Sequence, residues 1–381
     1  MINLNRPLYD YIIKNLGAYC KPDKEKAKSN LENTPEENKQ YLGTYSPKSF
    51  KESYVIFSDI FTVLKEYGFF NFKDEINILD LGSGTGAQMF GLLQVLEEKI
   101  NSPLNINIYS IDGNMNALEI QHKIFSNFWK ENFQKNKICW KYHHKAFNNG
   151  DEIASLVFKL CEPSSMDIVL SFKFLSELLK YDNLAYEKTI KACERILKND
   201  GILVFDDVTM EIKTLGQSEE QFIPYTLNKN ITKYMQQPHQ LNIVAPLCCF
   251  YNKNKCKRDW CYSQCSTYSY MLTDKGKENI LCKIDYRLFI KNGNLYDNIV
   301  DKFLNKFTDK CFKNCFFKQT LDFSDCYCIS YKCGFKRYFG DNINFEDSQF
   351  SLVKLKKIYD GQSENETYSG DIVIRDDDVP Y

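Results

Sequence analysis

A glycine-rich loop, placed between an apolar run and a helical pattern, constrains the fold of this chain more than any other feature. The stretch Ile78–Gly86 reads ILDLGSGTG and precedes apolar residues at helical spacing. Glycines let a backbone turn tightly and approach a ligand without Cβ clashes. The first turn of the following helix offers free N–H groups and a partial positive charge. A strand, a glycine loop and a helix in this order predict a nucleotide-type ligand.

Strands and helices alternate after this loop, which predicts an α/β fold. Apolar runs indicate strands at 76–81, 106–111, 138–144, 167–171 and 202–205, and helical spacing indicates helices at 87–99, 115–130 and 188–197. Such alternation predicts a Rossmann-like parallel sheet covered on both faces. Strand-like runs near 326–332 and 350–358 are expected to complete the sheet.

Changes in composition divide the 381 residues into five expected parts. Residues 1–75 form an N-terminal helical segment, within which 47–70 has the apolar spacing of a helix that packs on the next domain. The cofactor-binding core spans 76–210. A Cys-rich insertion at 211–285, C-terminal strands at 286–360 that complete the sheet, and an acidic tail at 361–381 follow.

Two acids identify the ligand class. Asp80 precedes the glycines and favours S-adenosylmethionine over a dinucleotide, because a carboxylate binds the ligand's ammonium group but repels a pyrophosphate. Asp112 ends the next strand, where an acid can bind two ribose hydroxyls. After the third strand, Phe147 can lie against adenine, and Asp151 or Asn148 can contact its amino group. The predicted cofactor-binding residues are Asp80, Gly82, Ser83, Gly84, Gly86, Asp112, Phe147 and Asp151.

These motifs resemble those of class I S-adenosylmethionine-dependent methyltransferases over about residues 47–210. The resemblance implies that fold type and methyl transfer to an acceptor beyond the C-terminal ends of the strands. Much of such catalysis is alignment of nucleophile and methyl group, so no residue type is obligatory. The candidate catalytic residues are Ser171, Lys173, Glu177 and Asp206. A helix cap or salt bridge is the alternative role for Glu177, and a strand-end turn is the alternative for Asp206.

Cysteine is unusually frequent in the C-terminal half. Eleven of the 15 cysteines fall between residues 248 and 333. No signal-like apolar run opens the chain, so a reducing cytoplasmic location is expected, with a mitochondrial one as the alternative. No apolar stretch is long enough to span a bilayer. Closely spaced thiolates next to Lys and Arg indicate a site for an iron–sulfur cluster or zinc, and buried small hydrophobes are the alternative.

The cysteine segment carries a second resemblance. The order of VLSFKFLSEL, then Ala245–Pro246, then cysteines, then Trp260 with SQ at 263–264 is similar to methyltransferase-like proteins of the small ribosomal subunit, which include mitochondrial ribosome-assembly factors. This resemblance implies a 4Fe-4S cluster and ribosomal RNA or the small ribosomal subunit as partner. The implied metal ligands are Cys249, Cys256, Cys261 and Cys326, with Cys248, Cys265 and Cys328 as alternates.

Three functions therefore remain in competition. The first is methyl transfer to an unidentified acceptor, with RNA favoured. The second is ribosome assembly, in which the basic segment 251–340, with 17 Lys and Arg against 9 Asp and Glu, binds ribosomal RNA. The third is a small-molecule or protein methyltransferase whose insertion forms a lid.

Overall fold

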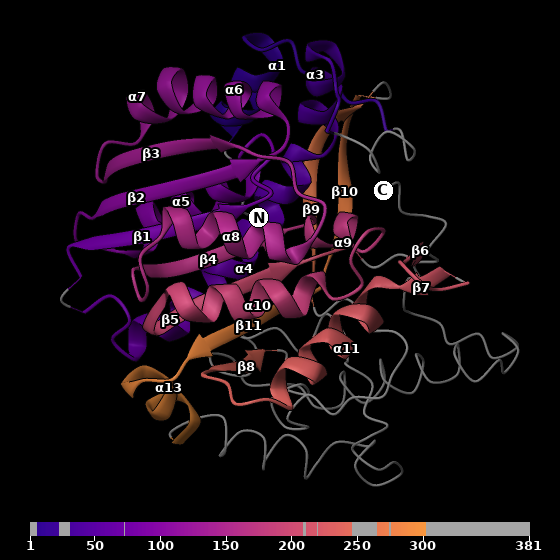
Figure 1. Ribbon diagram of the computed structural model, residues 1–381. Helices are drawn as coiled ribbons and strands as arrows, with labels where there is room; N and C mark the ends of the chain where they lie inside the picture. The colour runs from indigo at the N-terminus through magenta and orange to yellow at the C-terminus, as the bar shows by residue number, and fades with distance from the viewer. Residues whose placement is uncertain are drawn as a thin grey trace, which may run out of the picture.

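The computed structural model describes residues 6–22, 31–71, 73–208, 211–218, 220–245, 265–273 and 276–301 (Figure 1). Seven strands form one sheet in the order β3-β2-β1-β4-β5-β11-β8. Their bounds are β1 Glu75–Leu81, β2 Asn105–Asp112, β3 Lys137–His144, β4 Met166–Phe172, β5 Leu197–Asp206, β8 Leu241–Ala245 and β11 Tyr286–Lys291. The strands β1 to β5 run parallel, and β11 runs antiparallel to both of its neighbours. The Rossmann-like α/β fold class is therefore confirmed.

Helices cover both faces of this sheet. On one face, α4 (Ser46–Glu66) and α5 (Ala87–Lys99) bury an apolar cluster against the strands, and Phe57 of α4 lies parallel to Phe172 of β4 with ring centroids 6.3 Å apart. The other face carries α8 (Gly150–Leu160), α10 (Ala185–Ile196) and α11 (Ile223–Met235). The helix α8 was not predicted, although its apolar residues follow helical spacing.

The remaining elements lie around this core. The helices are α1 Arg6–Lys14, α3 Pro35–Thr44, α6 Met115–Ile124, a π-helical turn Phe125–Trp129, α7 Lys130–Asn132, α9 Leu175–Leu178 and α13 Asn294–Ile299. Two antiparallel pairs of strands are also present: β6 (Glu211–Lys213) pairs with β7 (Glu220–Phe222), and β9 (Cys265–Thr273) pairs with β10 (Gly276–Ile284). The expected helix over 115–130 is thus continued by a π turn and α7. No helix in the described ranges is long and apolar enough to cross a membrane.

The strands β8 and β11 complete the sheet. The strand β11 begins the 286–360 segment that was expected to complete the sheet, although no strand was predicted at its own residues. The expected runs at 326–332 and 350–358 lie outside the described residues, whereas β8 falls within 211–285, where few strand signals were seen. The strand β11 is fully buried but contains Arg287 and Lys291. The Lys291 ammonium donates to the carbonyls of Glu194 and Leu197, each at 2.8 Å. A search for apolar runs therefore misses this buried strand, because it contains charged side chains that are paired inside the protein.

Candidate cofactor and acceptor site

The C-terminal ends of the parallel strands meet at one edge of the sheet. Because β11 is antiparallel to β5, its first residue, Tyr286, pairs with the last residue of β5, Asp206, at this same edge. In open α/β sheets this edge is where ligands bind. The loops after β1, β2, β4 and β5 therefore define the candidate site.

The three glycines of the first loop are required for different reasons. A Cβ on Gly82 would lie 2.2 Å from Phe174, and one on Gly86 would lie 2.6 Å from Gln121. Both glycines allow close packing within the protein. Gly84 has a φ of +51°, and a Cβ there would meet no atom within 4 Å. Gly84 therefore borders open space, which is where a ligand can approach the backbone.

Asp112 links this loop to the end of β2. One carboxylate oxygen accepts a hydrogen bond from the Gly84 N–H and the other accepts one from the Asn114 N–H, both at 2.7 Å. An ionised carboxylate has about four lone-pair sites, so acceptor capacity remains. Burial raises the pKa of Asp112, and the two backbone N–H groups oppose this shift.

Asp80 lies beneath the loop rather than on its surface. Its side chain is fully buried, and the Gln88 amide nitrogen approaches its two oxygens at 3.2 and 3.3 Å. The same nitrogen donates to the carbonyls of Gly82 and Ser83 at 3.2 and 3.0 Å. Burial raises the pKa of Asp80 to about 8. Asp80 therefore supports the loop from beneath, and Gln88, which was not predicted from the sequence, organises that loop.

Two candidate catalytic residues, Lys173 and Asp206, lie at the ends of β4 and β5 on the side of the sheet that α4 covers. Lys173 has a φ of +55°, a conformation that costs a non-glycine residue about 1–2 kcal/mol. Its N–H donates to the Asp206 carbonyl at 2.7 Å, and its ammonium pairs with Glu52 of α4, which is 3% exposed. One side-chain oxygen of Asp206 is buried without a hydrogen-bond partner. Burial, together with the charge of Glu52, raises the pKa of Asp206 well above its ordinary value.

The neighbouring acids have distinct environments. Asp207 is saturated, because each of its oxygens accepts two hydrogen bonds. The donors are the Ser176 and Tyr186 hydroxyls at 2.6 Å and the Val208 and Ser176 N–H groups at 2.8 and 3.2 Å. The pKa of Glu177 is raised to about 8 by burial and by the charges of Asp112 and Asp207. The site is thus rich in carboxyl groups, which suits a cationic ligand.

Ser171 is separated from Asp206 by the sheet itself. Ser171 pairs in register with Phe205, whereas Asp206 pairs with Phe172, so the two side chains point to opposite faces. The Ser171 hydroxyl is also buried without a partner. Lys173, Glu52 and Asp206 therefore form one group, and Ser171 stands apart from it.

Comparison with known proteins identifies the family. The methyltransferase domain family matches residues 72–276, which is more than half of the chain. The chain belongs to this family. It is therefore an S-adenosylmethionine-dependent methyltransferase, as the motifs indicated.

Comparison with solved structures finds matches at low sequence identity. A putative class I S-adenosylmethionine-dependent methyltransferase from Listeria monocytogenes is 15% identical, with a TM-score of 0.36, and the match covers 77% of this chain and 71% of that chain. An S-adenosylmethionine-dependent methyltransferase from Methanosarcina mazei is 16% identical, with a TM-score of 0.32, over 60% of this chain and 97% of that chain. No curated protein matches the sequence.

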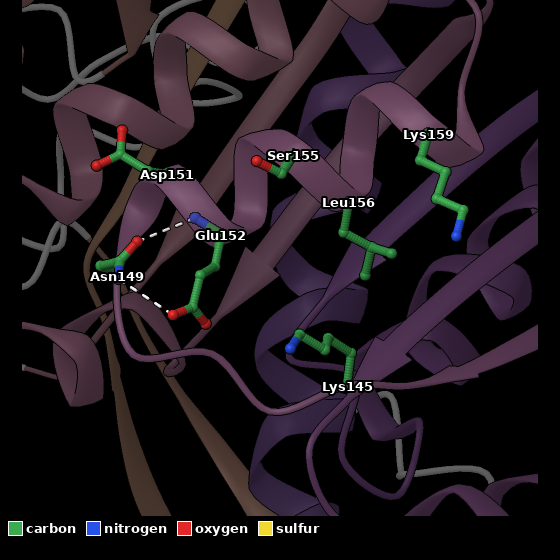
Figure 2. Close-up of a pocket in the computed structure, with 7 residues that line it drawn as sticks. All are labelled: Lys145, Asn149, Asp151, Glu152, Ser155, Leu156 and Lys159. Atoms are coloured by element: carbon green, nitrogen blue, oxygen red, sulfur yellow. Dashed lines mark hydrogen bonds between the residues drawn. The ribbon is translucent and has the colours of Figure 1, made fainter.

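The predicted adenine contacts occupy different surroundings in the methyltransferase. Phe147 is 4% exposed and lies edge-on to Phe174 at 6.1 Å, so it is part of the core beside the Gly82 turn. Asp151 lies in the first turn of α8, and its carboxylate pairs with the Lys188 ammonium at 2.6 Å. Figure 2 shows Asp151 beside Asn149 and Glu152 at the start of this helix. The adenine assignment of Phe147 and Asp151 remains a prediction.

The N-terminal segment contacts both cofactor loops, which the sequence did not reveal. The side-chain amides of Asn38 and Asn114 exchange hydrogen bonds at 3.4 and 3.3 Å, and both residues are buried. The hydroxyls of Ser46 and Thr85 lie 2.7 Å apart. The helices α3 and α4 therefore help to fix the positions of the loops after β1 and β2.

The predicted metal ligands cannot be placed. Cys248, Cys249, Cys256, Cys261, Cys326 and Cys328 lie outside the described residues, and Cys265 is described only as the first residue of β9. Within the described ranges no group of three or more His, Cys, Asp or Glu side chains is arranged to hold a metal ion. The metal module therefore remains a prediction.

Proposed function

We propose that this methyltransferase binds S-adenosylmethionine across the ends of β1 and β2 and methylates an RNA acceptor beyond β4 and β5. The observation that carries the cofactor site is the open space beside Gly84, next to a carboxylate of Asp112 that retains acceptor capacity. A Cβ at Gly84 would enter this space, as expected where a ligand lies against the backbone.

The charges of the site fit this cofactor. S-adenosylmethionine carries a sulfonium and an ammonium group, and Asp80, Asp112 and Glu177 surround the loop with carboxyl groups. When bound, the cofactor would supply an activated methyl group: the nucleophile's new bond to the methyl carbon replaces the carbon–sulfur bond, and the sulfonium leaves as a neutral thioether. The protein's task is then to hold the acceptor in line and to receive the proton that the acceptor loses.

Asp206 is the best placed residue for that proton. Its unpartnered oxygen is buried at the acceptor side of the site, and its raised pKa makes the carboxylate a stronger base than an exposed aspartate. The Lys173–Glu52 pair holds the loop after β4 against Asp206, because Lys173 contacts both residues. Glu177 is the second candidate, since its pKa of about 8 also suits proton transfer.

The experiment is methyl transfer from tritiated S-adenosylmethionine to RNA, protein and small-molecule fractions, with calorimetry of cofactor binding alongside. We expect ribonuclease-sensitive label. The Asp206→Asn variant should lose about 10²–10⁴-fold in kcat with unchanged cofactor affinity. Label in protein or small molecules, with none in RNA, would instead favour the alternative in which the insertion forms a lid.

The ribosome-assembly alternative rests on the cysteine segment. Its Fe–S or zinc module has as proposed ligands Cys249, Cys256, Cys261 and Cys326, with Cys248, Cys265 and Cys328 as alternates. Visible absorption and metal analysis of protein purified without oxygen would separate the cases. About four irons per chain would favour this alternative, zinc would support a metal module alone, and metal-free protein would count against it.

A further inference from the structure

One part of the sheet face on the α8 side is not covered by a helix. In Figure 1, α8 and α10 lie in front of β1, β4 and β5, whereas no helix lies in front of β3. Tyr109 of β2 pairs in register with Lys141, and Ile111 pairs with His143. Ile111 belongs to the core beneath α8, so Tyr109, Lys141 and His143 all point to this uncovered face.

Lysines surround this area. Lys141 lies in β3 and Lys145 follows its last residue, and both are exposed. Lys159 of α8 lies opposite Lys145 across a hollow of about 550 Å³, with Leu156 between them (Figure 2). Among the described residues, Lys145 and Lys159 have no ion-pair partner. We call Tyr109, Lys141, His143, Lys145 and Lys159 the β3 lysine face.

The acids of the hollow are already engaged. Asp151 pairs with Lys188 at 2.6 Å. The Glu152 carboxylate accepts hydrogen bonds from the Asn148 N–H and the Asn149 side-chain amide, each at 3.2 Å. The donors to Glu152 are neutral amides, so its carboxylate keeps its charge. Two lysines without an ion-pair partner, Lys145 and Lys159, face this single carboxylate, so the balance of unpaired charge in the hollow is positive and its complement is an anion.

Aromatic rings accompany these charges. The rings of Tyr109 and His143 are parallel within 8°, with centroids 6.3 Å apart. The Lys141 ammonium lies 4.8 Å from the Tyr109 ring centroid. Burial and the charge of Lys141 lower the pKa of His143, so its ring is neutral at pH 7. Planar rings interspersed with lysines are the usual surface for single-stranded nucleic acid, in which bases stack and phosphates pair with cations.

The β3 lysine face leads directly to the cofactor loops. The last residue of β3, His144, pairs in register with Asp112, and its imidazole lies 2.9 Å from the Gly113 carbonyl. The Lys145 N–H donates to the Asp112 carbonyl at 2.8 Å. We propose that the β3 lysine face binds the phosphate backbone of a single-stranded nucleic acid beside the cofactor site. This proposal deepens the proposed function and rests on it for the choice of RNA as the methyl acceptor.

The test measures binding of a fluorescein-labelled oligouridine of about 20 nucleotides. Fluorescence anisotropy reports the binding constant at each of a series of KCl concentrations. One variant of the full chain combines Lys141→Gln, Lys145→Gln and Lys159→Gln. The matched control has the same change in net charge on other surfaces, through Lys123→Gln, Lys130→Gln and Lys229→Gln, all exposed. Cofactor affinity is measured on every protein, so loss of the proposed function is scored separately from loss of nucleic-acid binding.

Wild type and control should bind the oligonucleotide with the same steep salt dependence. In the face variant, removal of three phosphate contacts should lower the slope of log K against log salt by about 2 and weaken binding by about tenfold or more. Equal affinity and slope in the face variant would overturn the proposal, as would equal losses in the control. Absence of oligouridine binding, with binding of polyglutamate to the same face, would assign the surface to an acidic protein instead.

Discussion

The substitution Gly84→Ala tests the cofactor site with a matched control elsewhere in the chain. Gly84 and Gly216 both have positive φ, at +51° and +78°, and a Cβ on either would meet no atom within 4 Å. Gly216 lies in the exposed turn between β6 and β7, far along the chain from the cofactor loops. The two substitutions therefore share a similar backbone cost and differ in whether the proposed cofactor would occupy the space that the new methyl group enters.

The shared cost can be estimated from the backbone. A non-glycine residue in the left-handed region costs about 1–2 kcal/mol, and replacing glycine recovers about 0.4–1 kcal/mol by restricting the unfolded chain. Each variant should therefore lose about 1 kcal/mol of unfolding free energy in urea denaturation. Both proteins should remain folded, which keeps the binding comparison valid.

The cofactor affinity should separate the two variants. A methyl group forced into a filled space costs about 1–3 kcal/mol, which corresponds to about 5- to 140-fold weaker binding of S-adenosylmethionine to Gly84→Ala. Gly216→Ala should bind as wild type does. Calorimetry measures both constants directly. Wild-type affinity in Gly84→Ala, with the shared loss of stability present, would refute the placement of the ligand against this loop.

Two further predictions concern buried charge. Arg287 donates to Asp285 at 2.7 Å, and both side chains are almost completely buried, so Arg287→Met should cost about 3–5 kcal/mol of unfolding free energy in urea. Lys191→Met, which removes a half-exposed partner of Glu187, should cost less than about 1 kcal/mol, and equal costs for the two would contradict this account. Asp80 and Glu177, with pKa values of about 8, are largely protonated at pH 7, so binding of a cationic cofactor should release protons and tighten as pH rises from 6 to 8. Calorimetry in buffers of different ionisation enthalpy measures the release, and an affinity that falls over this range would exclude the coupling.

The raised pKa values also imply a stability trend in the free protein. A carboxyl group whose pKa is higher in the folded state stabilises the fold while it is protonated in both states. This contribution is lost as pH rises from about 4 towards 8, because the unfolded chain ionises first. The carboxyl-rich site thus lowers the stability of the free protein at neutral pH, and a bound cation would offset that cost.

The pattern of apolar residues within single segments predicted the central strands and two of the helices. The strands β1 to β4 and the helices α5 and α10 were predicted close to their observed bounds, because apolar periodicity reflects burial in adjacent layers. The strand β5 was predicted at 202–205 but already begins at Leu197. The glycine loop and Asp112 were likewise predicted, because positive φ and the end of a strand are properties of single segments. The predicted Asp112 indeed lies against Gly84.

Contacts between distant segments could not be predicted in this way. The charge of Arg287 hides the buried strand β11 in the sequence. In the structure Asp285 neutralises this charge, and the side-chain oxygen of Asn228 in α11 accepts a hydrogen bond from the same guanidinium. Lys173 and Glu52 form an ion pair although they are 121 residues apart in the sequence, and no pattern in the sequence predicts this pair.

The sequence by itself determined that this chain forms a Rossmann-like sheet with a glycine loop between its first strand and the following helix. Only the tertiary structure decided which acid is sealed by hydroxyls, as Asp207 is, and which retains an unpartnered oxygen, as Asp206 does. It also decided that Gly84 borders open space while Gly82 and Gly86 border side chains. The physical reason is that burial and hydrogen-bond partners depend on which elements pack together, whereas backbone propensity and periodicity belong to each segment alone.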